Sequence, residues 1–171
     1  YAYVTDTFVY NADGEIIRQN IVSMVKAPCA SYNPQSVAEA WANHAGAFGT
    51  NDLDMIMLDY TEHSVVEVYD QAAGTATTHD CTAAIRAMFD GLFTTLGEPN
   101  PFTVPVDPAI DEPAGDMEFG QVFLLWQAPT RGLAHVTDTF VYSALSFKIL
   151  QQNIATFPMG GCPLVPTAPT D

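Results

Sequence analysis

The stretch VTDTFVYSALSFKILQQNIATF, residues 136–157, is the most informative part of the sequence, because the chain carries it twice. Residues 4–25 read VTDTFVYNADGEIIRQNIVSMV. The block VTDTFVY is identical at Val4–Tyr10 and Val136–Tyr142, an offset of 132 residues, and the tripeptide Gln-Asn-Ile recurs at an offset of 133. Alternating residues followed by turn chemistry are typical of a β-hairpin. We interpret the chain as the end of one repeat followed by one complete repeat.

The repeat divides the chain into three segments. We expect residues 1–29 to be the terminal β-hairpin and linker of a preceding repeat, residues 30–157 to be a complete domain, and residues 158–171 to be a Pro/Gly-rich linker or tail. Since the chain begins inside a repeat, we expect a processed product or a longer parent polypeptide. Cys29 and Cys162 stand at corresponding positions. They pair with each other, pair across chains or remain free thiols, and spacing does not decide.

The composition excludes several classes of partner. The chain carries 20 acidic residues against five basic ones, a net charge of −15, and its basic residues are scattered. Without a basic patch, binding to nucleic acid or to an anionic membrane surface is disfavoured. No apolar run reaches the roughly 20 residues that a membrane-spanning helix needs, so we expect no direct membrane insertion. The excess of acidic residues is interpreted as a means of keeping the protein soluble. The alternative is that it attracts a basic partner or loosely bound cations.

Residues 30–157 show helical periodicity first and strand periodicity later. Asn33-Pro34 is expected to open the first helix, which ends at Gly49, and Asn51 to cap the second. A third helix is expected between Asp80 and Gly97. The expected strands are residues 64–70, 75–78, 102–106, 121–128, 133–142 and 147–157.

This order of elements resembles the nuclear-transport-factor-2-like, or SnoaL-like, superfamily. The resemblance is carried by AEAWANHAGAFGTNDLDMIMLDYTEHSVVEVYD (Ala38–Asp70), by THDCTAAIRAMFDGLF (Thr78–Phe93) and by QVFLLWQAP…VTDTFVY…FKILQQNI. It implies an α+β cystatin-like fold, in which three N-terminal helices pack against a curved mixed or antiparallel sheet and leave a cone-shaped pocket. It does not specify an activity, because this fold hosts enzymes as well as catalytically silent assembly modules.

Asp138 is the sharpest candidate for a catalytic group. Strand alternation places it on one face with Val136, Phe140 and Tyr142. A carboxylate among apolar neighbours has a raised pKa, which suits a general acid or base. The alternative is a structural aspartate bonded to the backbone or to a helix side chain. Asp6 repeats this position and fits either interpretation.

A second cluster lies on the predicted helices. His44 and Tyr60, beside Trp41, are candidates for a base and a hydroxyl donor at the floor of the pocket. The alternative is a core histidine with one satisfied hydrogen bond. Further residues predicted to line the pocket are Trp126, Phe140 and Gln152.

The sequence gives no sign of a cofactor or metal. Its four histidines (His44, His63, His79 and His135) fall on different predicted elements, and no His-x-x-x-His or Cys-x-x-Cys motif occurs. In the iota-class carbonic anhydrases of the superfamily, the last strand carries histidines and serines. Gln151, Gln152 and Asn153 stand there in this chain, and amides do not exchange protons near neutral pH.

Two functions from different classes fit these observations. One is a domain whose pocket binds, or slowly transforms, a small apolar ligand. The other is a non-catalytic assembly or scaffold module, a homo-oligomer or a neighbour of other repeats or subunits, joined through its sheet faces and the N-terminal hairpin. The sequence does not decide between enzyme and binding protein, and it identifies neither a ligand nor a cellular compartment.

Overall fold

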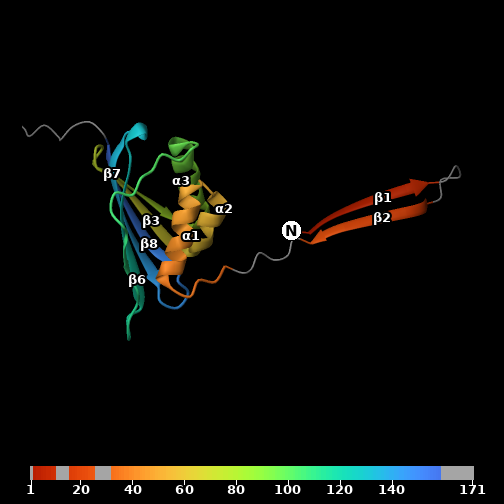
Figure 1. Cartoon of the computed structure of the whole chain (residues 1–171), viewed down its shortest axis with the longest axis horizontal. Coiled ribbons are helices and arrows are strands. Elements are labelled where there is room, and N and C mark those ends of the chain that lie inside the picture. Colours follow the sequence, from red (N-terminus) through yellow and green to blue (C-terminus); the bar gives the residue numbers. More distant parts are fainter. Residues whose placement is uncertain (1, 11–15, 26–31, 159–171) are drawn as a thin grey trace, which may run out of the picture. The chain divides into compact units, whose positions relative to one another are not determined.

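The computed structural model describes residues 2–10, 16–25 and 32–158. The chain divides into two compact units, Tyr1–Tyr32 and Asn33–Asp171. The first unit holds an antiparallel hairpin of β1 (Ala2–Tyr10) and β2 (Ile16–Val25), drawn in red and orange in Figure 1. Cys29 and Cys162 lie outside the described residues, and Cys81 is a free, half-buried thiol.

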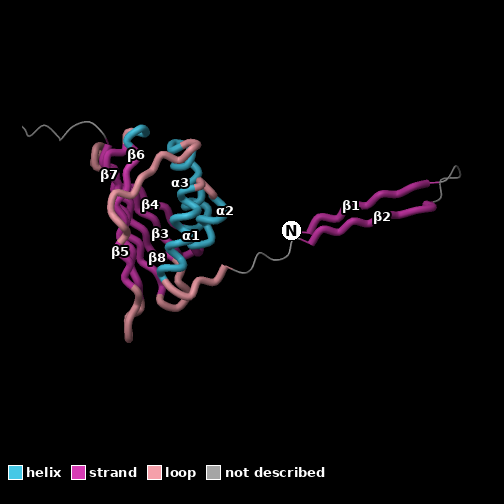
Figure 2. The backbone as a smooth tube through the Cα atoms, viewed as in Figure 1, coloured by secondary structure: helices cyan, strands magenta, loops and turns pink. Residues whose placement is uncertain are grey.

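The second unit has the predicted α+β architecture, with helices on one face of a mixed six-stranded sheet (Figure 2). The strand order is β4-β3-β8-β7-β6-β5, and all neighbours are antiparallel except β3 and β8, which run parallel. The elements are α1 (Val37–Gly49), α2 (Leu53–Ile56), a 3-10 turn (Met57–Asp59), β3 (Tyr60–Asp70), β4 (Thr75–Asp80), α3 (Cys81–Leu96), β5 (Ala109–Asp111), β6 (Phe119–Ala128), a second 3-10 turn (Pro129–Arg131), β7 (Leu133–Ser143) and β8 (Ile149–Pro158).

Helix α1 begins later than the sequence indicated. Asn33 and Pro34 were expected to open it, but the helix begins at Val37 and its N-cap is Ser36. The Ser36 hydroxyl accepts a hydrogen bond from the backbone N–H of Glu39 at 3.1 Å. Serine followed three residues later by glutamate is a capping signature, and it overrides the Asn-Pro signal upstream.

A carboxylate from a distant segment completes this cap. Glu112, which follows β5, accepts hydrogen bonds from the backbone N–H groups of Val37 at 2.9 Å and Ala38 at 2.8 Å. These N–H groups have no partner within the helix, and negative charge is favourable at a helix N-terminus. The contact fixes the start of α1 against the β5 edge of the sheet.

Two further boundaries differ from the prediction. Asp52, and not Asn51, caps α2, because Asn51 has a left-handed φ of 53° and its side chain donates to the backbone oxygen of Gly97 at 2.9 Å. The strand expected at residues 102–106 is wrong. That segment makes only a single bridge, between Thr103 and Gln127, and β5 forms further along at Ala109–Asp111. Pro105 within the segment, like Pro101 and Pro108 beside it, cannot donate to a strand ladder, which explains the interruption.

The core lies between α1, α3 and the inner face of the sheet. Alternate residues of β7 are buried and their neighbours are half-buried, as period-2 alternation requires. The buried face of α1 follows the helical spacing of three and four residues. Register shifts interrupt the pairing of β3 with β8, of β6 with β7 and of β7 with β8. Such irregularities bend strands, and here they curve the sheet around the helices (Figure 1).

Candidate functional site

Strands β7 and β8 bring the central polar groups of the site together. Asp138 pairs with Ile154, and Phe140 pairs with Gln152, so Asp138 and Gln152 are diagonal neighbours on the inner face. Asp138 is 3% exposed and Gln152 is 2% exposed. Polar side chains buried this deeply need hydrogen-bond partners, and the neighbouring strands supply them.

A continuous chain of hydrogen bonds runs through Asp138. Trp126 Nε1 donates to Asp138 Oδ2 at 2.6 Å, and Gln152 Nε2 donates to Asp138 Oδ1 at 2.9 Å. The other end of the amide, Gln152 Oε1, accepts from the hydroxyl of Tyr60 at 2.5 Å. The carboxylate can only accept, so this network fixes the orientation of the Gln152 amide.

Burial raises the pKa of Asp138 from 3.8 to about 6. Hydrogen bonds from Gln152 and Trp126, and the nearby His44, oppose this increase because they stabilise the charged form. A carboxyl group with a pKa of about 6 exchanges protons close to neutral pH, which an exposed aspartate does not do.

The neighbours of Asp138 also restrict where its proton can go. The Trp126 N–H and the Gln152 amide nitrogen are both donors, so neither can accept a hydrogen bond from the protonated acid. With the Gln152 amide in this orientation, the O–H is available to an acceptor on the cavity side. When ionised, the same group has lone pairs left over to accept from a ligand donor.

Tyr60 belongs to this network but does not line the cavity. Its predicted place on the second helix is wrong, because α2 ends at Ile56 and Tyr60 begins β3. The side chain is buried, and its hydroxyl lies behind Gln152. Burial is the main cause that raises the pKa of Tyr60, and the charges of Asp59, Tyr142 and Asp138 add to it. Tyr60 therefore stays protonated and orients Gln152 as a donor.

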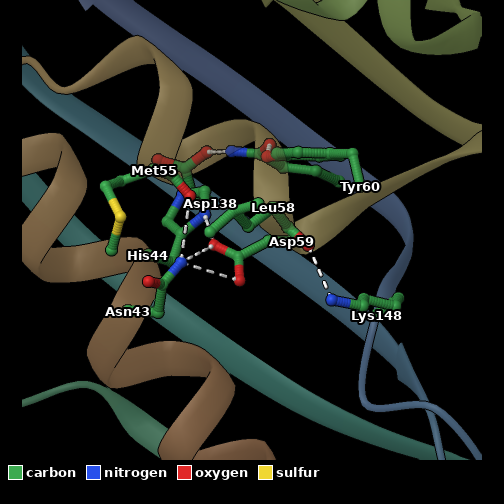
Figure 3. Close-up of polar contacts among 9 residues, drawn as sticks. Asn43, His44, Met55, Leu58, Asp59, Tyr60, Asp138 and Lys148 are labelled. Carbon is green, nitrogen blue, oxygen red and sulfur yellow. Dashed lines mark hydrogen bonds and ion pairs between the residues drawn. The ribbon is translucent and has the colours of Figure 1, made fainter. Parts of the chain in front are cut away.

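His44 forms a second buried pair with Asp59 (Figure 3). His44 Nδ1 lies 3.2 Å from Asp59 Oδ2, and the two side chains are 3% and 0% exposed. Asn43 Nδ2 donates to both carboxylate oxygens, at 3.1 and 3.2 Å. When Nδ1 carries the proton and donates to Asp59, Nε2 becomes the acceptor nitrogen of the ring. The pair thus fixes the tautomer of a histidine that also lines the cavity.

Lys148 adds a positive charge near this pair. Its ammonium group donates to the backbone oxygen of Leu58 at 2.7 Å, as Figure 3 shows. Partial burial lowers the pKa of Lys148, and the charge of Asp59 counteracts this decrease. The carboxylate of Asp59 is thus held by Asn43 and His44 of α1. The ammonium group of Lys148, which precedes β8, lies near it.

A cavity of about 250 Å³ lies between α1, α3 and the inner face of the sheet. Its polar contributors are His44, Asp107, Asp138 and Gln152. Its aromatic walls are Trp41, Phe48, Phe89, Phe102, Trp126 and Phe140. Exposed residues of the segment between α3 and β5, such as Val104 and Asp107, also line it and place the mouth there.

Six of the seven residues predicted for the site line this single cavity. They are Trp41, His44, Trp126, Asp138, Phe140 and Gln152. Tyr60 stands behind them, as described above. The sequence reasoning missed Asp59 and Asn43. Neither residue could be predicted from the helical pattern around His44, because the burial of Asp59 depends on the 3-10 turn before β3.

Within the described residues, no three histidine, cysteine or acidic side chains gather closely enough to hold a metal ion. The same residues contain no helix that is both long and apolar enough to span a membrane.

This geometry defines an α+β cone with a mostly apolar cavity and a buried carboxyl group at its wall. It is the cystatin-like, or nuclear-transport-factor-2-like, fold, as comparison with solved structures shows. A cystatin-like fold protein from Burkholderia xenovorans has 17% sequence identity and a TM-score of 0.51, over 72% of this chain and 91% of that chain. An NTF2-like protein of unknown function from Pseudomonas putida has 13% identity and a TM-score of 0.53, over 70% and 82%.

A protein of unknown function with a cystatin-like fold, from Nostoc punctiforme, has 10% identity and a TM-score of 0.51, over 72% of this chain and 90% of that chain. No family model and no curated protein sequence matches the chain. The predicted resemblance is therefore confirmed at the level of the fold, and likeness of fold does not define a function.

Proposed function

We propose that the domain binds a small, largely apolar molecule in the cavity beneath α1 and hydrogen-bonds its polar group through Asp138. One observation carries the proposal: a buried carboxyl group, held from behind by two N–H donors, lines an apolar cavity. Pockets that bind small molecules combine apolar walls with a few placed polar groups in this way. The same carboxyl would serve as a general acid or base toward a bound molecule.

The size of the cavity indicates the size of the ligand. A cavity of about 250 Å³ is larger than the engineered apolar cavity of about 150 Å³ that accepts benzene. A molecule with two fused aromatic rings is therefore a suitable probe. The aromatic side chains Trp41 and Phe140, whose ring centres lie 5.4 Å apart, offer edges and faces to such a ring system.

The test compares two probes that differ by one hydroxyl group, naphthalene and 2-naphthol. Above about pH 6 an ionised Asp138 accepts from the hydroxyl, and hydrogen bonds to charged groups exceed neutral ones by roughly 1 kcal/mol or more. We expect the preference for 2-naphthol to increase roughly tenfold between about pH 5 and pH 8. Fluorescence titration of the intact protein measures both dissociation constants.

Two variants make the test specific. Asp138→Asn is expected to abolish the pH dependence of the hydroxyl preference. Asp107→Asn removes a carboxylate that also lines the cavity but is exposed, and it should leave that dependence unchanged. Absence of binding by both probes, or equal effects of the two variants, would contradict the proposal.

A second candidate function, assembly with a second copy of the chain, is favoured by the outer face of β6. Phe119 and Phe123 point away from the buried alternate residues of this strand and are 44% and 49% exposed. Exposed aromatic side chains on a sheet face are typical of association surfaces. The net charge of −15 opposes the approach of two copies, so association should strengthen as salt screens this repulsion.

Sedimentation velocity at increasing salt concentration tests this assembly. The variant Phe123→Glu should remain monomeric at all salt concentrations, because it places a charge in the apolar contact. Gln121→Glu adds the same charge at an exposed position of the same strand face, and it is the matched control. A wild-type protein that stays monomeric at high salt would exclude the assembly.

A further inference from the structure

The hairpin of the first unit pairs in the same register as β7 and β8 of the second unit. Each residue of β1 from Tyr3 to Tyr10 has a counterpart in β7, and each of their β2 partners has a counterpart in β8. Whenever two residues pair in the first hairpin, their two counterparts pair in the second. The corresponding pairs, hairpin first, are Tyr3–Met24 and His135–Phe157, Val4–Ser23 and Val136–Thr156, Thr5–Val22 and Thr137–Ala155, Asp6–Ile21 and Asp138–Ile154, Thr7–Asn20 and Thr139–Asn153, Phe8–Gln19 and Phe140–Gln152, Val9–Arg18 and Val141–Gln151, and Tyr10–Ile16 and Tyr142–Ile149.

The two hairpins also share an irregularity. Pairing shifts between Val9 and Tyr10 in the first, and between Val141 and Tyr142 in the second. Counted between the last paired residues, the connections differ in length by one residue: residues 11–15 separate Tyr10 from Ile16, and residues 143–148 separate Tyr142 from Ile149. A loop normally sets the register of a hairpin. Because the same register occurs with two different loop lengths, we infer that the strand sequences determine it and the loop does not.

An isolated hairpin leaves the backbone groups on both of its outer edges without strand partners. A two-stranded hairpin is marginally stable in water, and open edges pair readily with other strands. In the second unit both edges are occupied: β7 pairs with β6 in antiparallel orientation, and β8 pairs with β3 in parallel orientation. A partner that fits the hairpin therefore offers one strand that pairs antiparallel with β1 and one that pairs parallel with β2.

We propose that the hairpin docks between a β3-like and a β6-like strand of a second domain of this fold that lacks its own central pair. Another Asn33–Asp171 domain is not the recipient, since its own β7 and β8 already fill that place. Docking would bring Asp6 and Gln19 to the register positions of Asp138 and Gln152, and so form the polar wall of a second cavity. The ligand chemistry of that cavity rests on the proposed function, whereas the docking does not.

A strand replacement within the full chain tests whether β2 can serve as β8. The block VTDTFVY is already identical, and of the β1 residues from Tyr3 to Tyr10 only Tyr3 differs from its counterpart, His135, so the test replaces β8. The substitutions are Leu150→Ile, Gln151→Arg, Ala155→Val, Thr156→Ser, Phe157→Met and Pro158→Val. We expect cooperative unfolding with Tm within about 5 °C of the wild type. The control carries the β2 sequence moved by one residue, which exchanges the two faces of the strand and should abolish cooperative unfolding. A replacement that fails like this control overturns the proposal.

Hydrogen–deuterium exchange on the complete polypeptide isolated from its source tests the docking itself. Peptides covering Ala2–Tyr10 and Ile16–Val25 should be as protected as those covering β7 and β8, because docking pairs the outer edges of the hairpin. Exchange of half of the hairpin amides within seconds, with β7 and β8 still protected, overturns the proposal. Neither measurement uses a ligand, so failure of the proposed binding function would be detected separately.

Discussion

Replacing Asp138 by Asn should change how the stability of the protein depends on pH. The introduced amide has nearly the same shape as the carboxyl, but it stays neutral at every pH. Trp126 can still donate to its oxygen. Its NH₂ group would face the NH₂ group of Gln152, so the Gln152 amide is expected to rotate and donate to Tyr60 instead. The network therefore survives, and the charge is the main difference between the two proteins.

The magnitude follows from the pKa of Asp138. Burial raises this pKa from 3.8 to about 6 in the folded protein, and the difference corresponds to about 3 kcal/mol. Between about pH 4 and pH 6 the folded state keeps a proton that the unfolded state has lost. The free energy of unfolding of the wild type should therefore decrease by about 3 kcal/mol over this range, relative to the variant, and the difference should stay constant above it.

Urea unfolding of both proteins at several pH values between about 3.5 and 8 measures this difference. Asp90→Asn, which removes an exposed carboxylate from α3, controls for the loss of one negative charge. A difference that does not change with pH would refute the reasoning. So would a wild type that gains stability relative to the variant as the pH rises, since this would require a lowered pKa for Asp138.

Two other perturbations have expected outcomes in the same unfolding assay. Asp59→Asn breaks the buried pair with His44 and should lower the free energy of unfolding by about 3–5 kcal/mol, whereas Asp54→Asn, in an exposed pair, should lower it by less than about 1 kcal/mol. Gly120→Ala would place a methyl group 2.4 Å from a valine side chain of α1 and should destabilise by about 1–3 kcal/mol. Gly91→Ala on α3 meets open space and should stabilise by up to about 1 kcal/mol.

The elements that could be predicted from the sequence are those whose signals are local. Asp80 and Gly97 bound α3 as expected. Gly97 has a positive φ of 71°, which favours glycine at the end of a helix, and its N–H donates to the backbone oxygen of Phe93, whereas the side chain of Asp80 makes no capping hydrogen bond. The start of α1 was missed because Glu112, distant in the chain, holds its first N–H groups. No periodicity within the helix contains that information.

The same distinction between local signals and tertiary contacts applies to the residues of the site. Strand alternation correctly grouped Asp138 with Phe140 on a buried face, since the period of a strand is a local property. The identity of the donors to Asp138 could not be predicted, because it depends on how β6, β7 and β8 are aligned. Asp59 was overlooked for a related reason: acidic residues are rarely fully buried, and only the tertiary structure pairs this one with His44.

The energetic cost of Asp138 bears on the choice between a structural and a functional role. Above about pH 6 its buried charge destabilises the fold, and the two N–H donors only partly compensate. An asparagine or an apolar residue would fill the same space without that cost, since replacing a buried charge by neutral groups is often neutral or stabilising. Both copies of VTDTFVY nevertheless carry the aspartate, at Asp6 and Asp138. The recurrence at Asp6 fits either role, but the energetic cost of the buried charge at Asp138 supports the proposed role in the cavity.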